Sequence, residues 1–219
     1  QPNDILAFGY ANANDEAGSP LKLVPIKRVG SPHDDPEIKA DSAFASASAI
    51  RRAIANHSLQ TVQEVVPEPS MAMIKQQPML TWDDFWPWLR FELVENPVNQ
   101  LHSIYQMSEG IEFRLKRAAI KAESFTEFLH LVKTKRYTYT RIQRLCTYVL
   151  LHASSHDMLQ SVGDVRVLGF NAKGRAYLSQ VKHDLTLPLI TKVNDQTVTD
   201  DIQMDFRSGM LIQMITGVR

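Results

Sequence analysis

The stretch ASASAIR, residues 45–51, places small side chains, hydroxyl groups and a guanidinium where a helix should begin. Ser46 or Ser48 can cap a helix whose first backbone N–H groups lack intrahelical acceptors, and such an end carries a partial positive charge. Small side chains let a phosphate approach these amides, and Arg51 lies one turn inside. These features suit a phosphate cradle. The residues alone nevertheless favour the alternative, a serine-capped, alanine-rich helix that serves only packing.

A second stretch, KTKRYTYTRIQR (133–144), interleaves cations with aromatic rings. Tyr137 and Tyr139 are its rings, and phosphates would attract the cations while unpaired bases stack on the tyrosines. The pattern is equally compatible with contact to unpaired nucleic acid and with a solvated basic turn between two helices. The cations are Lys133, Lys135, Arg136, Arg141 and Arg144.

The basic stretch belongs to a wider asymmetry of charge. The formal net charge of the 219 residues is zero. Residues 111–144 carry 9 basic and 3 acidic side chains, a balance of +6, whereas residues 1–110 carry 8 basic and 14 acidic, a balance of −6. A basic block inside a neutral chain indicates a polyanionic partner more specifically than the total charge does.

The other reactive side chains form weaker patterns. His33, Asp34 and Asp35 offer one imidazole and adjacent carboxylates, which we interpret as a polar loop rather than a metal or acid–base site. No metal site is predicted and no catalytic residue is assigned. Cys146, the single cysteine, should be buried and inert, which excludes an internal disulfide and fits a reducing compartment. Trp82, Trp86 and Trp88 have helical spacing, which is more typical of a core than of base stacking.

The elements that must position these residues are mostly helical. Helices are predicted over 4–17, 46–57, 58–66, 81–95, 97–107, 111–122, 124–133, 138–153, 171–183 and 199–215. Strands are predicted over 21–28, 165–168 and 187–193. Pro67 and Pro69 indicate a boundary. The predicted fold is therefore mainly α with a small α/β part, with domains at 1–70 and 71–219. No apolar run of about eighteen residues predicts a membrane span.

Six blocks extend the pattern over nearly the whole chain. They are PNDILAFGY (2–10), IKRVGSPHD (26–34), SASAIRR (46–52), EGIEFRLKRAA (109–119), KTKRYTYTRIQRL (133–145) and RVLGFNAKGRAYL (166–178). In this order they resemble the tRNA(Met) cytidine acetate ligase family. The third block also resembles the Ser-Ser/Thr-x-Ile-Arg motif of the HIGH-type nucleotidyltransferase superfamily, which opens a helix late in a Rossmann-like domain and binds the triphosphate of ATP.

The resemblance implies a function. Such enzymes activate acetate with ATP, here expected with Mg²⁺, and then acetylate N4 of the wobble cytidine of elongator tRNA(Met) in the cytoplasm. The family's ATP residues fall on Asn3, Arg28 and Val29, and Arg28 would lie at the carboxyl end of a strand. Ser46, Ser48 and Arg51 would hold the phosphates. Residues 1–70 would be the C-terminal piece of the Rossmann-like ATP domain, and 71–219 a helical tRNA-binding domain.

The chain departs from the family in one respect. The family's His-x-Gly-His motif does not occur in residues 1–219. We therefore expect this chain to be a C-terminal portion with little or no ligase activity by itself. Two other functions share some of its features: an adenylyltransferase of cofactor biosynthesis, which explains the phosphate motif but not the basic block, and a non-catalytic RNA-binding module.

Overall fold

The chain folds into two compact units, Gln1–Met79 and Leu80–Arg219. The computed structural model describes residues 2–33, 35–159, 163–193 and 202–217, without the side chains of Pro2 and Asn3. The units divide after Met79, whereas the sequence places a domain boundary at residue 70. Pro67 and Pro69 begin a helix instead of ending a domain, since proline is tolerated in the first turn.

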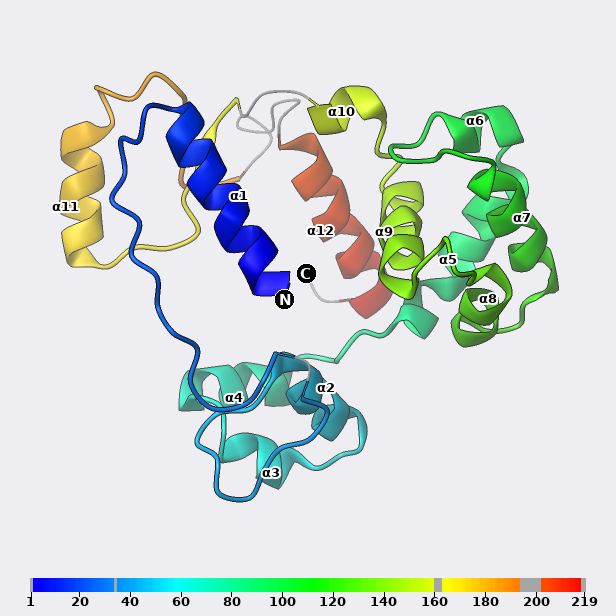
Figure 1. Cartoon of the computed structure of the whole chain (residues 1–219), viewed down its shortest axis with the longest axis horizontal. Helices are drawn as coiled ribbons and strands as arrows, with labels where there is room; N and C mark the ends of the chain where they lie inside the picture. The colour runs from blue at the N-terminus through cyan, green and yellow to red at the C-terminus, as the bar shows by residue number, and fades with distance from the viewer. Residues whose placement is uncertain (1, 34, 160–162, 194–201, 218–219) are drawn as a thin grey trace. The chain divides into compact units, whose positions relative to one another are not determined.

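The first unit contains four helices in its described residues (Figure 1). They are α1 (Pro2–Glu16), α2 (Ala47–Ala55), α3 (Leu59–Gln63) and α4 (Glu68–Gln76). The last three pack in sequence order, α2 on α3 and α3 on α4. Ala49, Val62 and Met71 are their buried apolar side chains. These contacts fix the orientation of α2, whose N-terminus carries the predicted phosphate cradle.

The predicted strand over residues 21–28 is wrong. This segment has no strand pairing, and its apolar side chains are exposed, with Ile26 at 91%. Alternating Leu21, Leu23 and Ile26 satisfy the two-residue period of a strand, but a strand also needs a hydrogen-bonded neighbour. Within the described residues, no other segment pairs with this one. The α/β character expected of the first unit is therefore not observed there.

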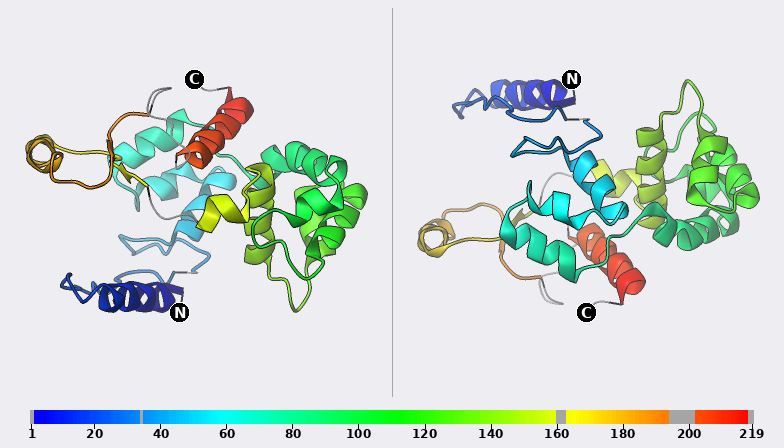
Figure 2. Two further views of the ribbon diagram at one scale, coloured as in Figure 1. Left: turned by 90° about the horizontal axis from the view of Figure 1, so that it is seen from above. Right: turned by 90° about the horizontal axis from the view of Figure 1, so that it is seen from below.

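The second unit is built on a helical bundle, which Figures 1 and 2 show from three sides. Its helices are α5 (Trp82–Glu95), α6 (Val98–His102), α7 (Ile111–Lys121), α8 (Phe125–Val132) and α9 (Tyr139–Leu150). Helix α5 packs against α7, α8 and α9, and α6 packs against α7. The inward face of α7 carries Ile111, Leu115 and Ala118, and Ala122, which follows the helix, is also buried.

Aromatic side chains form one end of the bundle core. Trp82 stacks on Phe125 with ring centroids 4.5 Å apart, and Trp86 lies 5.1 Å from Phe128. These two tryptophans are core residues, as predicted. Trp88 instead remains 46% exposed, because it lies on the other side of α5.

The remainder of the second unit holds the only sheet among the described residues. Strands β1 (Val165–Arg166) and β2 (Leu189–Ile190) pair in parallel, with Val165 opposite Leu189. Both strands were predicted, and they are shorter than expected. Helices α10 (Ser155–Leu159), α11 (Ala172–Val181) and α12 (Gln203–Thr216) complete the unit. Asn171 caps α11, because its side-chain oxygen accepts the Gly174 N–H. None of the helices in the described ranges combines the length and the apolar character needed to cross a membrane.

Candidate functional site

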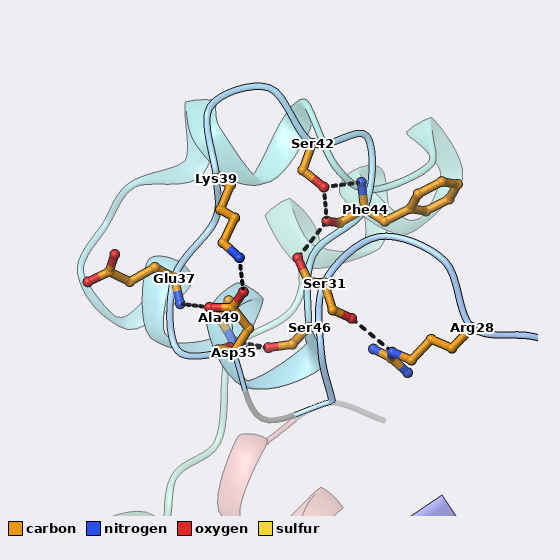
Figure 3. A network of polar contacts seen from close by, with 9 residues as sticks. All are labelled: Arg28, Ser31, Asp35, Glu37, Lys39, Ser42, Phe44, Ser46 and Ala49. Carbon is orange, nitrogen blue, oxygen red and sulfur yellow. Dashed lines mark hydrogen bonds and ion pairs between the residues drawn. The ribbon is translucent and has the colours of Figure 1, made fainter.

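Ser46 is the cap of α2, and its only hydroxyl proton is already donated within the protein (Figure 3). Its Oγ accepts the Ala49 N–H at 2.9 Å and donates to the Asp35 carbonyl oxygen at 2.5 Å. Ser46 itself is completely buried. It therefore fixes the start of the helix rather than offering its hydroxyl to a ligand. The exposed groups at this end are Ala47 and Ser48, the first two helical residues, whose N–H groups have no intrahelical acceptor.

Hydrogen bonds tie Arg28 to the segment that leads into α2 (Figure 3). The Nε of Arg28 donates to the Ser31 carbonyl oxygen at 2.9 Å. The hydroxyl of Ser31 donates to the Phe44 carbonyl oxygen at 3.0 Å, and that of Ser42 donates to the same oxygen at 2.6 Å. The bond through Nε leaves the two terminal nitrogens of the Arg28 fork available to an anion.

Gly30 allows the close approach on which this network depends. Its φ is +81°, in the left-handed region, and a Cβ at this position would lie 2.7 Å from the Cβ of Phe44. A side chain would therefore clash with Phe44 and strain the backbone. The turn between Arg28 and Ser31 can contact the segment before α2 only because residue 30 is glycine.

The polar loop predicted at 33–35 has a structural role at Asp35. Its carboxylate pairs with Lys39 at 2.9 Å and accepts the Glu37 N–H at 3.3 Å. Lys39, and then the Glu37 N–H, lower the pKa of Asp35 below its usual value. Asp34 lies outside the described residues. Among the residues that are described, no group of three His, Cys, Asp or Glu side chains could hold a metal ion.

Some of the predicted nucleotide residues are brought together and others are not. Arg28 and Ser46 belong to one connected loop and helix start, and Val29 and Arg51 are exposed. Arg28 does not lie at a strand end, since its segment is not a strand. Asn3 lies in the first turn of α1, and its side chain is outside the described part of the chain. Its place beside the other residues stays a prediction.

Part of the basic block caps helices instead of facing a partner. Arg114 donates to the carbonyl oxygens of Leu131 and Val132, both at 2.7 Å, at the end of α8. Lys116 donates to those of Val94 at 2.5 Å and Asn96 at 2.7 Å, at the end of α5. Helix ends leave such carbonyl groups without partners and carry partial negative charge. The donors of these two cations are thus engaged within the fold, although both residues keep their charge.

The tyrosines of the basic stretch differ in exposure. Tyr137 is only 7% exposed, and the Arg141 guanidinium lies 5.2 Å from its ring centroid. Tyr139 is 42% exposed, with Lys133 Nζ 5.5 Å from its ring. Of the two rings, Tyr139 is the one that a base could reach. The structure places Tyr137 in the core, and its RNA contact stays a prediction that this burial disfavours.

The cations of the stretch also differ in their partners. Arg136 pairs with Glu109 at 2.5 Å, and Arg141 lies 3.6 Å from the same carboxylate. Lys135 and Arg144 are exposed, and the structure assigns them no partner among the residues it describes. Lys135 lies between α8 and α9, and Arg144 lies on α9. These two are the best available anchors for a polyanion.

Cys146 is buried, as predicted. Its side chain extends from α9 into the bundle core, where burial raises the pKa of its thiol far above the ordinary value. A thiol that stays protonated is a poor nucleophile.

The sequence of this chain is similar to those of several known proteins. The tRNA(Met) cytidine acetate ligase of Levilactobacillus brevis is 44% identical over 216 residues, which are 99% of this chain and 56% of that protein. The protein of the same name from Lactiplantibacillus plantarum is 40% identical over 217 residues, 98% of this chain and 57% of that one. The chain thus spans about half the length of the curated relatives it matches.

Solved structures agree with these relatives. The apo form of Thermotoga maritima TmcAL has a TM-score of 0.87 at 25% identity, covering 99% of this chain and 56% of that one. The form bound with alpha-thio ATP has a TM-score of 0.84 at 25% identity, covering 100% of this chain and 56% of that one. The model of the HIGH Nucleotidyl Transferase family matches residues 1–218. With a match over nearly its whole length, this chain belongs to the HIGH nucleotidyl transferase family.

Proposed function

We propose that the protein containing this chain is an ATP-dependent acetate ligase that forms N4-acetylcytidine at the wobble position of elongator tRNA(Met) in the cytoplasm. The observation that carries the proposal is the 44% identity to a tRNA(Met) cytidine acetate ligase over 99% of the chain. The chain would contribute part of the ATP site from its first unit and an RNA surface from its second.

The proposed ATP site rests on the start of α2 and on Arg28. Phosphate oxygens could accept hydrogen bonds from the backbone amides of Ala47 and Ser48 and from the two terminal guanidinium nitrogens of Arg28. The solved relative bound with alpha-thio ATP supports a nucleotide site in this family. The expected Mg²⁺ stays a prediction, since no group of three His, Cys, Asp or Glu side chains in the described ranges could hold a metal ion.

The reaction would need positioning and charge stabilisation more than a protein nucleophile. A carboxylate oxygen of acetate attacks the α-phosphorus of ATP, and pyrophosphate leaves as acetyl-adenylate forms. N4 of cytidine then attacks the acetyl carbon, loses a proton and releases AMP. Donors at α2 and Arg28 would stabilise the charge that develops on the departing pyrophosphate.

The reaction itself gives the first test. The intact protein, supplied with ATP, acetate and elongator tRNA(Met), should release AMP and form N4-acetylcytidine in equal amounts. A tRNA with uridine at the wobble position is the control and should yield no acetylated base. Transfer of AMP to a mononucleotide, without any acetylation, would instead support the adenylyltransferase alternative.

A salt titration tests the RNA surface. Lys135→Ala combined with Arg144→Ala should weaken tRNA binding and reduce the slope of log affinity against log salt by about 1.4–1.8, because two phosphate contacts are lost. The matched control is Lys22→Ala with Lys75→Ala, which removes two exposed cations from the first unit. An unchanged slope in the first double variant would remove these two residues from the RNA surface.

A further inference from the structure

The turn before α7 is strained, and the family resemblance gives it no role. Glu109 and Gly110 have φ values of +64° and +77°, so two consecutive residues are left-handed. Glycine adopts this conformation freely, but a glutamate is disfavoured there by its Cβ. Such strain persists only where surrounding contacts impose it, and it is often found at functional sites.

The contacts that hold this turn come from the basic stretch. The hydroxyl of Tyr137 donates to the Glu109 carbonyl oxygen at 3.3 Å. The Glu109 carboxylate lies 2.5 Å from Arg136 Nη2 and 3.6 Å from Arg141 Nη2. Arg141 also reaches the Ser108 hydroxyl at 3.5 Å and lies over the Tyr137 ring. The strained backbone thus delivers one carboxylate to a position between two guanidinium groups.

The same position suits a phosphate. Carboxylate and phosphate oxygens both accept hydrogen bonds from the planar fork of arginine. The side chains are accessible, since those of Glu109 and Arg136 are 39% and 62% exposed. Ion pairs at this exposure are weak and screened by salt, so a strand that brings several phosphates can displace the carboxylate.

We infer that Glu109 occupies the binding position of an RNA phosphate between Arg136 and Arg141, and that it weakens RNA binding by competing with that phosphate. The inference rests on the proposed RNA-binding function. An RNA that also engages Lys135 and Arg144 has enough contacts to displace the carboxylate. Because such an RNA must break the ion pair of Glu109, its affinity is lowered by the free energy of that pair.

The test is Glu109→Gln, which keeps the size of the side chain and the carbonyl contact with Tyr137 but removes the charge. Affinities of the intact protein for elongator tRNA(Met) and for a uridine 20-mer are measured over a range of salt. The 20-mer should bind about two- to fivefold more tightly, with a salt slope steeper by about 0.7. The tRNA should also bind more tightly, because it no longer has to break the ion pair of Glu109.

Two controls separate this effect from simple charge removal. Glu123→Gln removes an exposed carboxylate at the end of α7, and should change the affinity for the 20-mer less than Glu109→Gln does. When Arg136 and Arg141 are both alanine, Glu109→Gln should have no further effect. Weaker or unchanged binding of the 20-mer by Glu109→Gln, or an equal gain from Glu123→Gln, overturns the inference.

The outcomes also distinguish this inference from the RNA surface on which it depends. If Lys135→Ala with Arg144→Ala leaves the salt slope of tRNA binding unchanged, the proposed surface fails. If that double variant weakens binding while Glu109→Gln changes nothing, the surface stands and only the competing role of Glu109 is refuted.

Discussion

Replacing Arg28 by alanine is expected to raise the KM for ATP of the intact protein by roughly 10- to 150-fold. Hydrogen bonds to a charged group contribute about 1.5–3 kcal/mol, which corresponds to this range. The guanidinium is held in place by its Nε bond to the Ser31 carbonyl oxygen, so its free end is ordered before ATP arrives. The measurement is ATP-dependent product formation at saturating acetate and tRNA.

Two further variants show whether geometry or charge is responsible. Lys27→Ala removes the neighbouring exposed cation and should change the KM for ATP by less than about threefold, since surface charges contribute little. Arg28→Lys keeps the charge but loses both the fork and the Nε donor, so most of the defect should remain. Equal effects of Lys27→Ala and Arg28→Ala would show that Arg28 makes no specific contact with the nucleotide.

The sequence predicts those features that depend on neighbours along the chain. The apolar spacing of Ile111 and Leu115 places α7, and side-chain oxygens of Ser46 and Asn171 mark where α2 and α11 begin. Each depends on contacts within about four residues, which local pattern and capping rules describe. Helix limits were less accurate, as with α6, which is only 5 residues long within the predicted 97–107.

Features that depend on distant residues could not be predicted in this way. Residues 21–28 have the alternation of a strand, but no strand among the described residues pairs with them. The link from Arg28 to Phe44 through Ser31 spans a loop whose path no periodicity describes. Gly30, two residues after Arg28, is the local sign of the tight turn.

The basic block, residues 111–144, shows that prediction of the candidate site from sequence has the same limit. Its charge predicts a polyanionic partner, yet sequence alone cannot tell a cation that faces solvent from one that caps a helix. Arg114 caps α8, which ends 18 residues further on. Lys116 caps α5, which lies some 20 residues before it. Such pairings are set by helix packing. Only the folded structure therefore shows which cations remain available to bind a polyanion.

Lys116→Met should therefore lower the free energy of unfolding by about 1.5–3 kcal/mol without weakening RNA binding. Methionine keeps the length of the side chain but cannot donate to the carbonyl oxygens of Val94 and Asn96, which would lose a charged donor at the end of α5. Urea unfolding of the intact protein measures the stability, and the tRNA salt titration measures binding.

Lys121→Met is the matched control, because it removes the same charge from the last turn of the same helix. Its cost should stay below about 1 kcal/mol, the usual contribution of a cation near a helix C-terminus. An equal loss of stability in both variants would mean that charge alone matters and that the bonds from Lys116 to α5 contribute nothing. A weaker tRNA affinity for Lys116→Met in the folded protein would show that Lys116 reaches the RNA after all.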